Sequence, residues 1–219
     1  MSKKYNAALG AYQIIKNYEG KLVMGIGTGS TTDFFTKEFL PKLKDKITSI
    51  YSSSYRTSQL LVELGFHVTK YQKNAYIDVY IDGADEVDLN LNLIKGGGGA
   101  HTNEKRLAKQ AKTFICIVDE EKLVETLGKF PLPVEIEPKY YNDCLASLRR
   151  FSQNIKKREQ LSDNENYLCD LYEFSISAPL KTEEEILSIN GIIDVGIFAF
   201  DKPTSVVVGL ESGYRFIDS

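Results

Sequence analysis

The chain has little of what a metal centre or a disulfide framework needs. It contains two histidines, His67 and His101, and three cysteines, Cys116, Cys144 and Cys169, which show no paired spacing. Because imidazole and thiolate are common transition-metal ligands, a site of that kind is not expected. The sparse, odd-numbered set of cysteines indicates reduced thiols in a reducing compartment, where their simplest role is that of small buried side chains.

The chain also lacks a surplus of positive charge and any long apolar run. Lys and Arg total 27 against 30 for Asp and Glu, a formal net charge of −3. Nucleic-acid-binding proteins usually carry a basic surplus or stripe, so nucleic acid is not an expected partner. No apolar run approaches the roughly 20 residues that a membrane span needs, so a membrane is not one either. Residues 1–12 lack the apolar core of a secretory signal, and we therefore expect a cytoplasmic protein.

What the chain has is a regular alternation of strand-like and helix-like segments. Ala8, Ala11, Tyr12 and Ile15 stand at helical spacing and predict an amphipathic helix over residues 5–18. Further helices are predicted around 34–40, 57–64 and 102–111, and strands at 22–26, 47–51, 75–81 and 114–118. Strands that alternate with helices imply crossover connections and a parallel sheet.

The regular alternation of strands and helices changes after Pro131 and Pro133, two prolines that favour an extended hinge. Beyond it we predict strands at 134–136, 156–160, 167–174 and 195–200, and helices at 142–151 and 183–189. Thr182 and Glu185 have the spacing of a capping box for the last helix. The order βαββαβ is that of a ferredoxin-like lobe. The predicted fold is therefore α/β, with a Rossmann-like parallel-sheet domain (1–130 and about 204–219) and a smaller ferredoxin-like α+β lobe (131–203).

Three polar clusters follow predicted strands, and the first is the glycine-rich run GIGTGSTT at residues 25–32. Ligands in open α/β sheets bind at the carboxyl ends of strands. A dinucleotide-binding loop would have glycine where Ser30 stands and an acid about 20 residues later, and neither is present. Because hydroxyls and backbone amides suit an anion, the run indicates a phosphate monoester site. A tight turn with a helix cap is the alternative.

The second cluster is DGADEVD at residues 82–88, with four carboxylates in seven residues. Carboxylates can bind a cation, contact sugar hydroxyls or act in acid–base chemistry, or they can lie in solvent. The spacing is not that of a calcium-binding loop, but the residues alone leave these readings open.

The third cluster is KGGGGAHTNEK at residues 95–105. Four consecutive glycines carry an entropic cost, which close approach of a ligand would explain. If Thr102 caps the next helix, Glu104 lies in its first turn, where dipole compensation is its simplest role. His101 is expected to be a loop histidine, and Lys122 by itself a surface lysine. Together the clusters supply an anion cradle, carboxylates and a lysine, the parts for proton transfer beside a carbonyl in a phosphorylated sugar.

Four motifs, in this order and spacing, resemble the type A ribose-5-phosphate isomerases. They are GIGTGSTT (25–32), DGADEVD (82–88), KGGGGAHTNEK (95–105) and GKFPLPVEI (128–136), and the similarity runs nearly end to end. The resemblance implies interconversion of ribose 5-phosphate and ribulose 5-phosphate through a cis-enediolate, with no metal and no cofactor. It also implies a homodimer or homotetramer whose partner is the phosphosugar substrate.

The resemblance implies roles residue by residue. Glu104 matches the proton-transferring base, and Lys95 suits the developing oxyanion. Asp82 and Asp85 match aspartates that assist ring opening and contact hydroxyls. The remaining substrate-binding positions are Thr28, Gly29, Ser30, Thr31, Gly83, Ala84, Gly96, Gly97, Gly98 and Lys122. Ala7 and Ala8 stand where relatives have a first-helix lysine, and neither Lys3 nor Lys4 is assigned that role.

Two rival functions remain at this level. One is an isomerase for another phosphosugar, or a relative of amino-sugar-phosphate deaminases with a similar sheet. The other is a non-catalytic sugar-phosphate sensor, of the kind fused to DNA-binding domains. A sensor needs the phosphate cradle but not a base, so the presence of Glu104 with both aspartates favours the enzyme.

Overall fold

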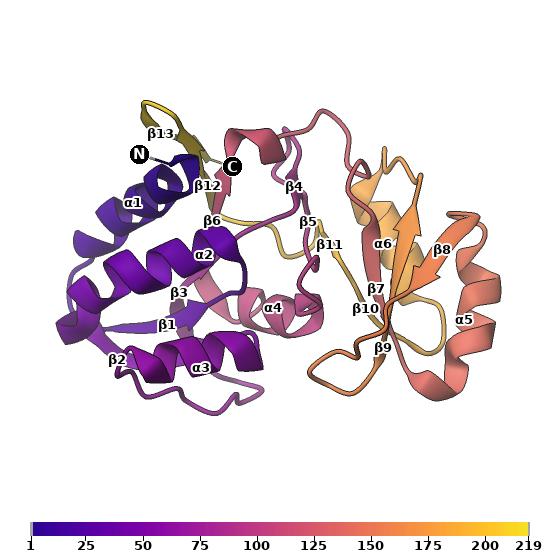
Figure 1. The fold of residues 1–219 in the computed structure, drawn as a ribbon, viewed down its shortest axis with the longest axis horizontal. Coiled ribbons are helices and arrows are strands. Elements are labelled where there is room, and N and C mark those ends of the chain that lie inside the picture. The colour runs from indigo at the N-terminus through magenta and orange to yellow at the C-terminus, as the bar shows by residue number, and fades with distance from the viewer. Residues whose placement is uncertain (1, 219) are drawn as a thin grey trace. The chain divides into compact units, whose positions relative to one another are not determined.

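The computed structural model describes residues 2–218, whose contacts group into two units (Figure 1). Unit 1 comprises the chain up to Gly83, Asn103–Lys122 and the chain from Pro203 on, and unit 2 comprises Ala84–Thr102 and Leu123–Lys202. The sequence-based boundary after residue 130 puts residues 84–102 in the first domain, whereas their contacts are made mainly with unit 2. Boundaries of independently folding domains stay a prediction.

Unit 1 contains a six-stranded sheet with the order β13-β12-β6-β3-β1-β2. Its strands are β1 (Leu22–Ile26), β2 (Ile47–Ser52), β3 (Ile77–Asp82), β6 (Ala111–Asp119), β12 (Ser205–Leu210) and β13 (Gly213–Asp218). All neighbours pair in parallel except β12 and β13, which form an antiparallel hairpin at one edge. The predicted parallel, Rossmann-like sheet is confirmed, while the β12–β13 hairpin was not predicted as strands.

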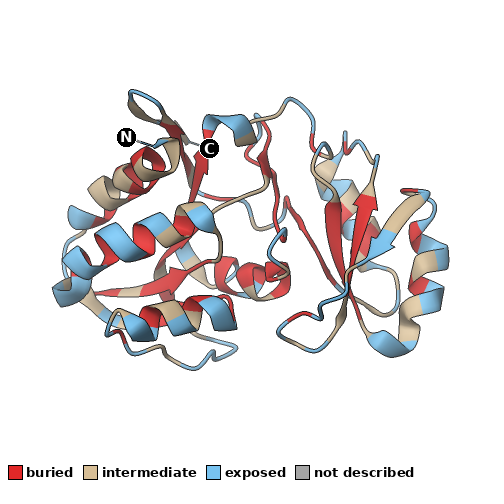
Figure 2. Ribbon diagram, viewed as in Figure 1, coloured by how far each residue is buried: buried red, intermediate tan, exposed pale blue. Residues whose placement is uncertain are grey.

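Helices pack on this sheet through small and apolar side chains. The helical segments of unit 1 are α1 (Lys3–Lys16), α2 (Ser30–Phe34), a π-helical turn (Phe35–Phe39), a 3₁₀ stretch (Leu40–Lys46), α3 (Tyr55–Glu63) and a 3₁₀ turn (Glu120–Lys122). Helix α4 (His101–Ala108) begins in unit 2 and continues in unit 1. Ala7, Ala8, Ala11 and Ile15 are fully buried on α1, which lies against β12 and β6 (Figure 2). The predicted amphipathic helix is confirmed, and it starts earlier because Ser2 accepts a hydrogen bond from the amide of Tyr5.

Unit 2 contains an antiparallel four-stranded sheet with the order β10-β7-β9-β8. In chain order it is formed by β7 (Leu132–Ile136), a 3₁₀ turn (Pro138–Tyr140), α5 (Tyr141–Leu148), β8 (Asn154–Lys157), β9 (Tyr167–Tyr172), α6 (Pro179–Leu187) and β10 (Ile192–Val195). The connectivity is βαββαβ, as predicted for a ferredoxin-like lobe. Its core gathers Val134, Ile136, Cys169 and Leu171 with helix residues such as Leu148.

The expected capping box of the last helix is wrong. Helix α6 begins at Pro179 with Ala178 as its N-cap, so Thr182 lies inside the helix and its amide donates to the carbonyl of Ala178 at 2.9 Å. Proline at the first position needs no amide partner and has a suitable φ, which explains the earlier start.

A small three-stranded sheet, order β11-β5-β4, was not predicted. It is made by β4 (Glu86–Val87), β5 (Leu93–Ile94) and β11 (Ile197–Phe198), all in unit 2 and all antiparallel. A strand of two residues is too short to show an alternation of apolar and polar side chains in the sequence. The predicted strand over 195–200 is therefore replaced by the end of β10 and by β11, which pairs with β5.

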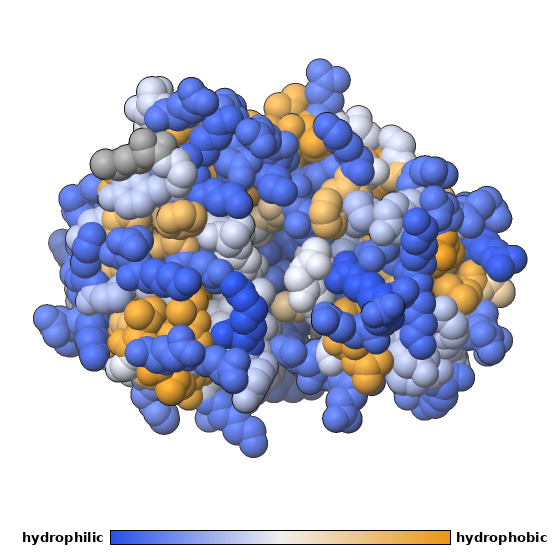
Figure 3. Space-filling view, viewed as in Figure 1, coloured by the Kyte–Doolittle hydropathy of each residue, from blue (hydrophilic) through white to orange (hydrophobic). Residues whose placement is uncertain are grey.

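No helix among the described residues 2–218 has both the length and the apolar character to cross a bilayer. In the view of Figure 3 most side chains are hydrophilic and the hydrophobic ones form separate small patches. This agrees with a sequence in which charged residues make up 26%.

Candidate active site

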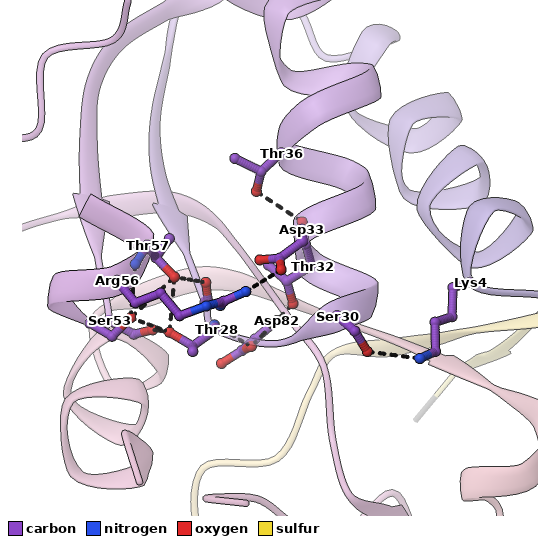
Figure 4. A network of polar contacts seen from close by, with 12 residues as sticks. Lys4, Thr28, Ser30, Thr32, Asp33, Thr36, Ser53, Arg56, Thr57 and Asp82 are labelled. Atoms are coloured by element: carbon purple, nitrogen blue, oxygen red, sulfur yellow. Dashed lines mark hydrogen bonds and ion pairs between the residues drawn. The ribbon is translucent and has the colours of Figure 1, made fainter. Parts of the chain in front are cut away.

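A buried carboxylate, Asp82, is the centre of a polar network in unit 1 (Figure 4). It is the last residue of β3 and is fully buried. Its Oδ1 accepts hydrogen bonds from the amides of Thr28 (3.0 Å) and Gly83 (2.7 Å) and from the hydroxyl of Thr32 (3.4 Å). Its Oδ2 accepts from the hydroxyl of Tyr80. Four donors offset the cost of burying this charge and hold it in one orientation.

Gly27 is required by the position of Asp82. A Cβ added to Gly27 would lie 1.9 Å from Cγ of Asp82 and 2.0 Å from its Oδ1. No heavier side chain fits in that space, so the glycine-rich turn after β1 admits the carboxylate at the end of β3. The two strands are hydrogen-bonded neighbours, which brings the loops at their carboxyl ends together.

Four hydroxyls gather beside this turn. The hydroxyl of Thr28 donates to Ser54 Oγ at 2.7 Å and lies 2.9 Å from Ser53 Oγ and 3.0 Å from Thr57 Oγ1. Ser54 is the N-cap of α3, where its side chain accepts from the amide of Thr57. The sequence analysis found Thr28 but missed the other three. Their signal is the run of serines that follows the predicted strand at 47–51, a further loop at a strand end.

Lysines lie near the start of α2. Nζ of Lys4 donates to Ser30 Oγ at 2.8 Å (Figure 4). Lys3 forms ion pairs with Glu120 at 3.1 Å and Glu121 at 3.0 Å. The pKa of Glu121 is lowered by its hydrogen bond from Lys3, and further by the charges of Lys122 and Lys4. These contacts put Lys4 and the predicted Lys122 in the same charged neighbourhood, and Lys4 is a residue that the sequence analysis left unassigned.

Glu104 lies in the first turn of α4 and is buried. Tyr80 is also fully buried, and the effect of the Glu104 charge on its pKa shows that the two side chains lie near each other. Burial raises the pKa of Tyr80 well above its ordinary value, and the negative charges of Asp82 and Glu104 raise that pKa further. Unit 1 thus gathers a tyrosine and two carboxylates in its interior. Tyr80 was missed by the sequence analysis, although its i, i+2 spacing from Asp82 on one strand implies a shared face.

The predicted cap at Thr102 is wrong. Thr102 is the second residue of α4, and its hydroxyl donates to Oε2 of Glu135. Glu135 is fully buried on β7, and its Oε1 accepts from Ser162 and Asn166, both at 2.8 Å. The threonine therefore ties the start of α4 to the sheet of unit 2, with Glu104 still in the first turn.

The four carboxylates of residues 82–88 accept hydrogen bonds from different partners. Asp85 Oδ2 accepts from the amide of Gly97 at 2.8 Å. Buried Glu86 accepts from the amides of Gly128 (2.7 Å) and Phe130. Buried Asp88 closes a turn by accepting from the amides of residues 90 and 92, both at 2.8 Å. The loop is therefore not a solvated acidic run, and Glu86 and Asp88 organise the backbone around it.

The lysine–glycine loop lies in unit 2 with Asp85. Lys95 is buried, its amide donates to the carbonyl of Gly196 at 2.8 Å, and its Nζ lies 5.5 Å from the ring centroid of Phe198. Gly96 has φ +104°, a conformation that favours glycine, and its carbonyl accepts from the amide of Gly99 at 2.9 Å. Gly97 and Gly98 are exposed, so their backbone is open to a ligand.

The predicted site residues are distributed over both units. Unit 1 contains Thr28, Gly29, Ser30, Thr31, Asp82, Gly83, Glu104 and Lys122. Unit 2 contains Ala84, Asp85, Lys95, Gly96, Gly97 and Gly98. Across residues 2–218 no three His, Cys, Asp or Glu side chains cluster as metal ligands would.

Fold and site together define an α/β protein that presents hydroxyls, carboxylates and lysines at the carboxyl ends of parallel strands. The sequence profile of the family described as ribose 5-phosphate isomerase A (phosphoriboisomerase A) matches residues 49–213. The chain belongs to this family.

Relatives and solved structures agree over nearly the whole chain. Ribose-5-phosphate isomerase A of Francisella tularensis subsp. novicida is 41% identical over 201 residues, 91% of this chain and 89% of the relative. The crystal structure of ribose 5 phosphate isomerase A from Neisseria gonorrhoeae superposes with a TM-score of 0.92 at 38% identity, covering 99% and 96% of the two chains. A D-ribose-5-phosphate isomerase in complex with phospho-erythronic acid gives 0.90 at 38% identity, covering 99% and 98%.

Proposed function

We propose that this protein is an aldose–ketose isomerase that interconverts D-ribose 5-phosphate and D-ribulose 5-phosphate. The observation that carries the proposal is the buried Glu104 in the first turn of α4, beside Tyr80 and Asp82, in a chain of the ribose 5-phosphate isomerase A family. A sensor of phosphosugars would need the phosphate-binding loop but no buried base, so the enzyme is favoured.

The phosphate binds at the start of α2. Thr28, Gly29, Ser30 and Thr31 supply hydroxyls and backbone amides, and Lys122 supplies positive charge. Lys4, whose ammonium group already contacts Ser30, adds a second cation. A related isomerase in complex with phospho-erythronic acid supports a phosphorylated ligand for this site. Binding energy from this remote group then orients the reacting carbons.

The reaction moves one proton between C1 and C2. Glu104 removes the proton from C2 of the open-chain aldose, and the electrons of the C–H bond form the C1–C2 double bond of a cis-enediolate with the negative charge on O1. The hydroxyl proton of O2 passes to O1, and the same carboxyl group returns the carbon-bound proton to C1, which leaves the carbonyl at C2. The negative charge that develops on oxygen is stabilised by Lys95 and the amides of the loop Gly96, Gly97 and Gly98. Asp82 and Asp85, with Gly83 and Ala84 between them, contact the sugar hydroxyls and assist ring opening.

The proton transfer needs no metal in this scheme, because Glu104 and the developing oxyanion's donors are supplied by the chain. The protein acts as a homodimer or homotetramer in the cytoplasm. Support for a reducing compartment comes from Cys116, Cys144 and Cys169, which are buried and form no disulfide within the described residues.

The test is Glu104→Gln, which keeps size and hydrogen-bonding capacity but removes the base. General-base catalysis contributes about 10²–10⁴-fold, so kcat should fall at least about 100-fold while the affinity for inorganic phosphate stays the same. Exchange of the C2 proton with deuterated solvent, followed in a single turnover, is the direct readout. Glu63→Gln, at the exposed end of α3, is the matched control.

A helix-dipole role for Glu104 gives a different result. The variant would then lose about 0.3–1 kcal/mol of stability and would exchange and isomerise at nearly the parental rate. Free ribose supplies a second check, because it has no phosphate group for the phosphate-binding loop to bind. Equal kcat/KM for ribose and ribose 5-phosphate would refute the proposed substrate.

A further inference from the structure

One peptide group of the glycine loop is held at both ends. The amide of Gly97 donates to Oδ2 of Asp85 at 2.8 Å, and the carbonyl of the same peptide, Gly96 O, accepts from Nη1 of Arg158 at 3.0 Å. The same Nη1 also donates to the carbonyl of Gly97 at 3.1 Å. Two successive carbonyls therefore face the guanidinium, and the amide between them faces the carboxylate.

Arg158 is itself fixed to the sheet of unit 2. Its Nε and Nη2 donate to the two carboxylate oxygens of Asp170 at 2.8 and 2.6 Å, which is the bidentate geometry that only arginine offers. Asp170 lies in the middle of β9, and the backbone amide of Arg158 donates to the carbonyl of Leu168 at 2.8 Å. The side chains of Arg158 and Asp170 are 19% and 11% exposed, so this pair is largely shielded from solvent.

Packing alone does not hold the loop in place. Gly97 and Gly98 are exposed, and an opening of about 510 Å³ lies beside the loop, lined by the glycines, Phe130, Pro131 and residues 158–161 among others. Four successive glycines have wide conformational freedom. The hydrogen bonds of the guanidinium, together with the bond from the Gly99 amide to the Gly96 carbonyl, therefore restrain the loop on this side.

We infer that Arg158, oriented by Asp170, is a positioning residue for the isomerisation. It turns the carbonyls of Gly96 and Gly97 away from the ligand side, where they would repel a developing oxyanion, and it keeps the Gly97 amide on Asp85. The inference rests on the proposed function, since Asp85, Lys95 and the glycine loop are the groups that it would place. No motif of the sequence analysis includes Arg158 or Asp170.

The experiment compares Arg158→Met with the parent protein and with Arg150→Met as the matched control. Arg150 is an exposed arginine of the same unit whose Nη2 donates to the carbonyl of Glu185 at 3.3 Å and whose guanidinium lies 4.7 Å from the ring centroid of Phe151. A misplacement of about 1 Å costs up to about 10²-fold in rate, so kcat of Arg158→Met should fall about 10–100-fold. The inhibition constant of inorganic phosphate should not change, because the phosphate-binding residues are in unit 1. Arg150→Met should behave as the parent.

Two further arms separate positioning from folding. Arg158→Lys keeps the charge but cannot donate to both carbonyls and both carboxylate oxygens, so it should recover only part of the lost kcat. Asp170→Asn keeps the volume and one acceptor, so kcat should also fall, but by less than in Arg158→Met. Amide hydrogen exchange of residues 95–100 should be faster in Arg158→Met, with the rest of unit 2 protected as in the parent.

The outcomes are distinct. Parental kcat and parental exchange of residues 95–100 in Arg158→Met would overturn the inference. So would a loss of protection throughout unit 2 in Arg158→Met and Asp170→Asn together, which would mean a purely structural pair. If the parent protein itself does not isomerise ribose 5-phosphate, the proposed function fails, while the exchange measurement still decides whether Arg158 holds the loop.

Discussion

The hydroxyl of Tyr80 donates a hydrogen bond to Oδ2 of Asp82, and both residues are fully buried on β3. Burial and the nearby charges of Asp82 and Glu104 hold the pKa of Tyr80 well above its ordinary value. Tyr80 therefore stays protonated and remains a donor to Asp82 over the whole neutral range. The pair holds the Asp82 side chain in one orientation, in contact with the turn that follows β1.

Tyr80→Phe should destabilise the protein and slow turnover together. Hydrogen bonds to charged groups contribute roughly 1.5–3 kcal/mol, so denaturant unfolding should show a loss of that size. The matched control is Tyr18→Phe, because the hydroxyl of Tyr18 lies 3.2 Å from the neutral hydroxyl of Thr113. A neutral bond contributes only about 0.5–1.5 kcal/mol. Equal losses in the two variants would show that Asp82 does not depend on Tyr80.

Lys4→Met should weaken phosphate binding and leave chemistry nearly intact. The ammonium group of Lys4 contacts Ser30 at the proposed phosphate site, so KM for ribose 5-phosphate and the inhibition constant of inorganic phosphate should rise together. A hydrogen-bonded charge contributes roughly 1.5–3 kcal/mol, which corresponds to about 10-fold or more in affinity. Lys16→Met, in the last turn of α1, is the control. An unchanged KM would remove Lys4 from the site.

Activity should survive exhaustive chelation. The chain has only two histidines, and Asp82, Glu86 and Asp88 already accept hydrogen bonds from backbone or side-chain donors. Initial rates measured before and after dialysis against EDTA are expected to agree. Loss of turnover that a divalent ion restores would favour a metal-assisted hydride shift over proton transfer.

Stability should fall between about pH 9 and pH 11 in part because of Cys169. Burial raises the pKa of this thiol from 9.0 to about 11. In that window the unfolded chain loses its thiol proton while the folded chain keeps it, so unfolding becomes more favourable as the pH rises. Urea denaturation of Cys169→Ala should show a flatter decline than the parent across this window. Parallel curves from pH 8 to pH 11 would contradict the assignment.

Local patterns in the sequence predicted most of the sheet and helix order. Strands 22–26 and 47–51 and the first helix were anticipated because short apolar or β-branched runs and helical spacing can be recognised from neighbouring residues. Elements that depend on distant partners were not. Strands β4, β5 and β11 have two residues each and exist through their pairing, and α6 begins at Pro179 rather than at the expected capping box.

For the candidate site, the sequence identified loops but not the contacts within them. The motifs pointed to Thr28, Asp82, Asp85 and Glu104, whose catalytic roles remain proposals. They did not single out Ser54, Lys4 or Arg158, because each contacts a residue that is far away in the chain. They also did not single out Tyr80, although it lies two residues from Asp82 on the same strand. A tyrosine or an arginine in a strand-rich stretch has no motif of its own.

By itself, the sequence determined the alternation of strands and helices, the glycine-rich turns and the family to which the chain belongs. These depend on local spacing and on motifs a few residues long. The tertiary structure decided the contacts of the four carboxylates in residues 82–88. One is buried among four donors, one accepts from the amide of a glycine in the glycine loop, and two accept from backbone amides of turns. It also joined Arg158 to Gly96 across 62 positions of the chain. Burial and hydrogen-bond geometry arise only when distant segments pack, so no local pattern specifies them.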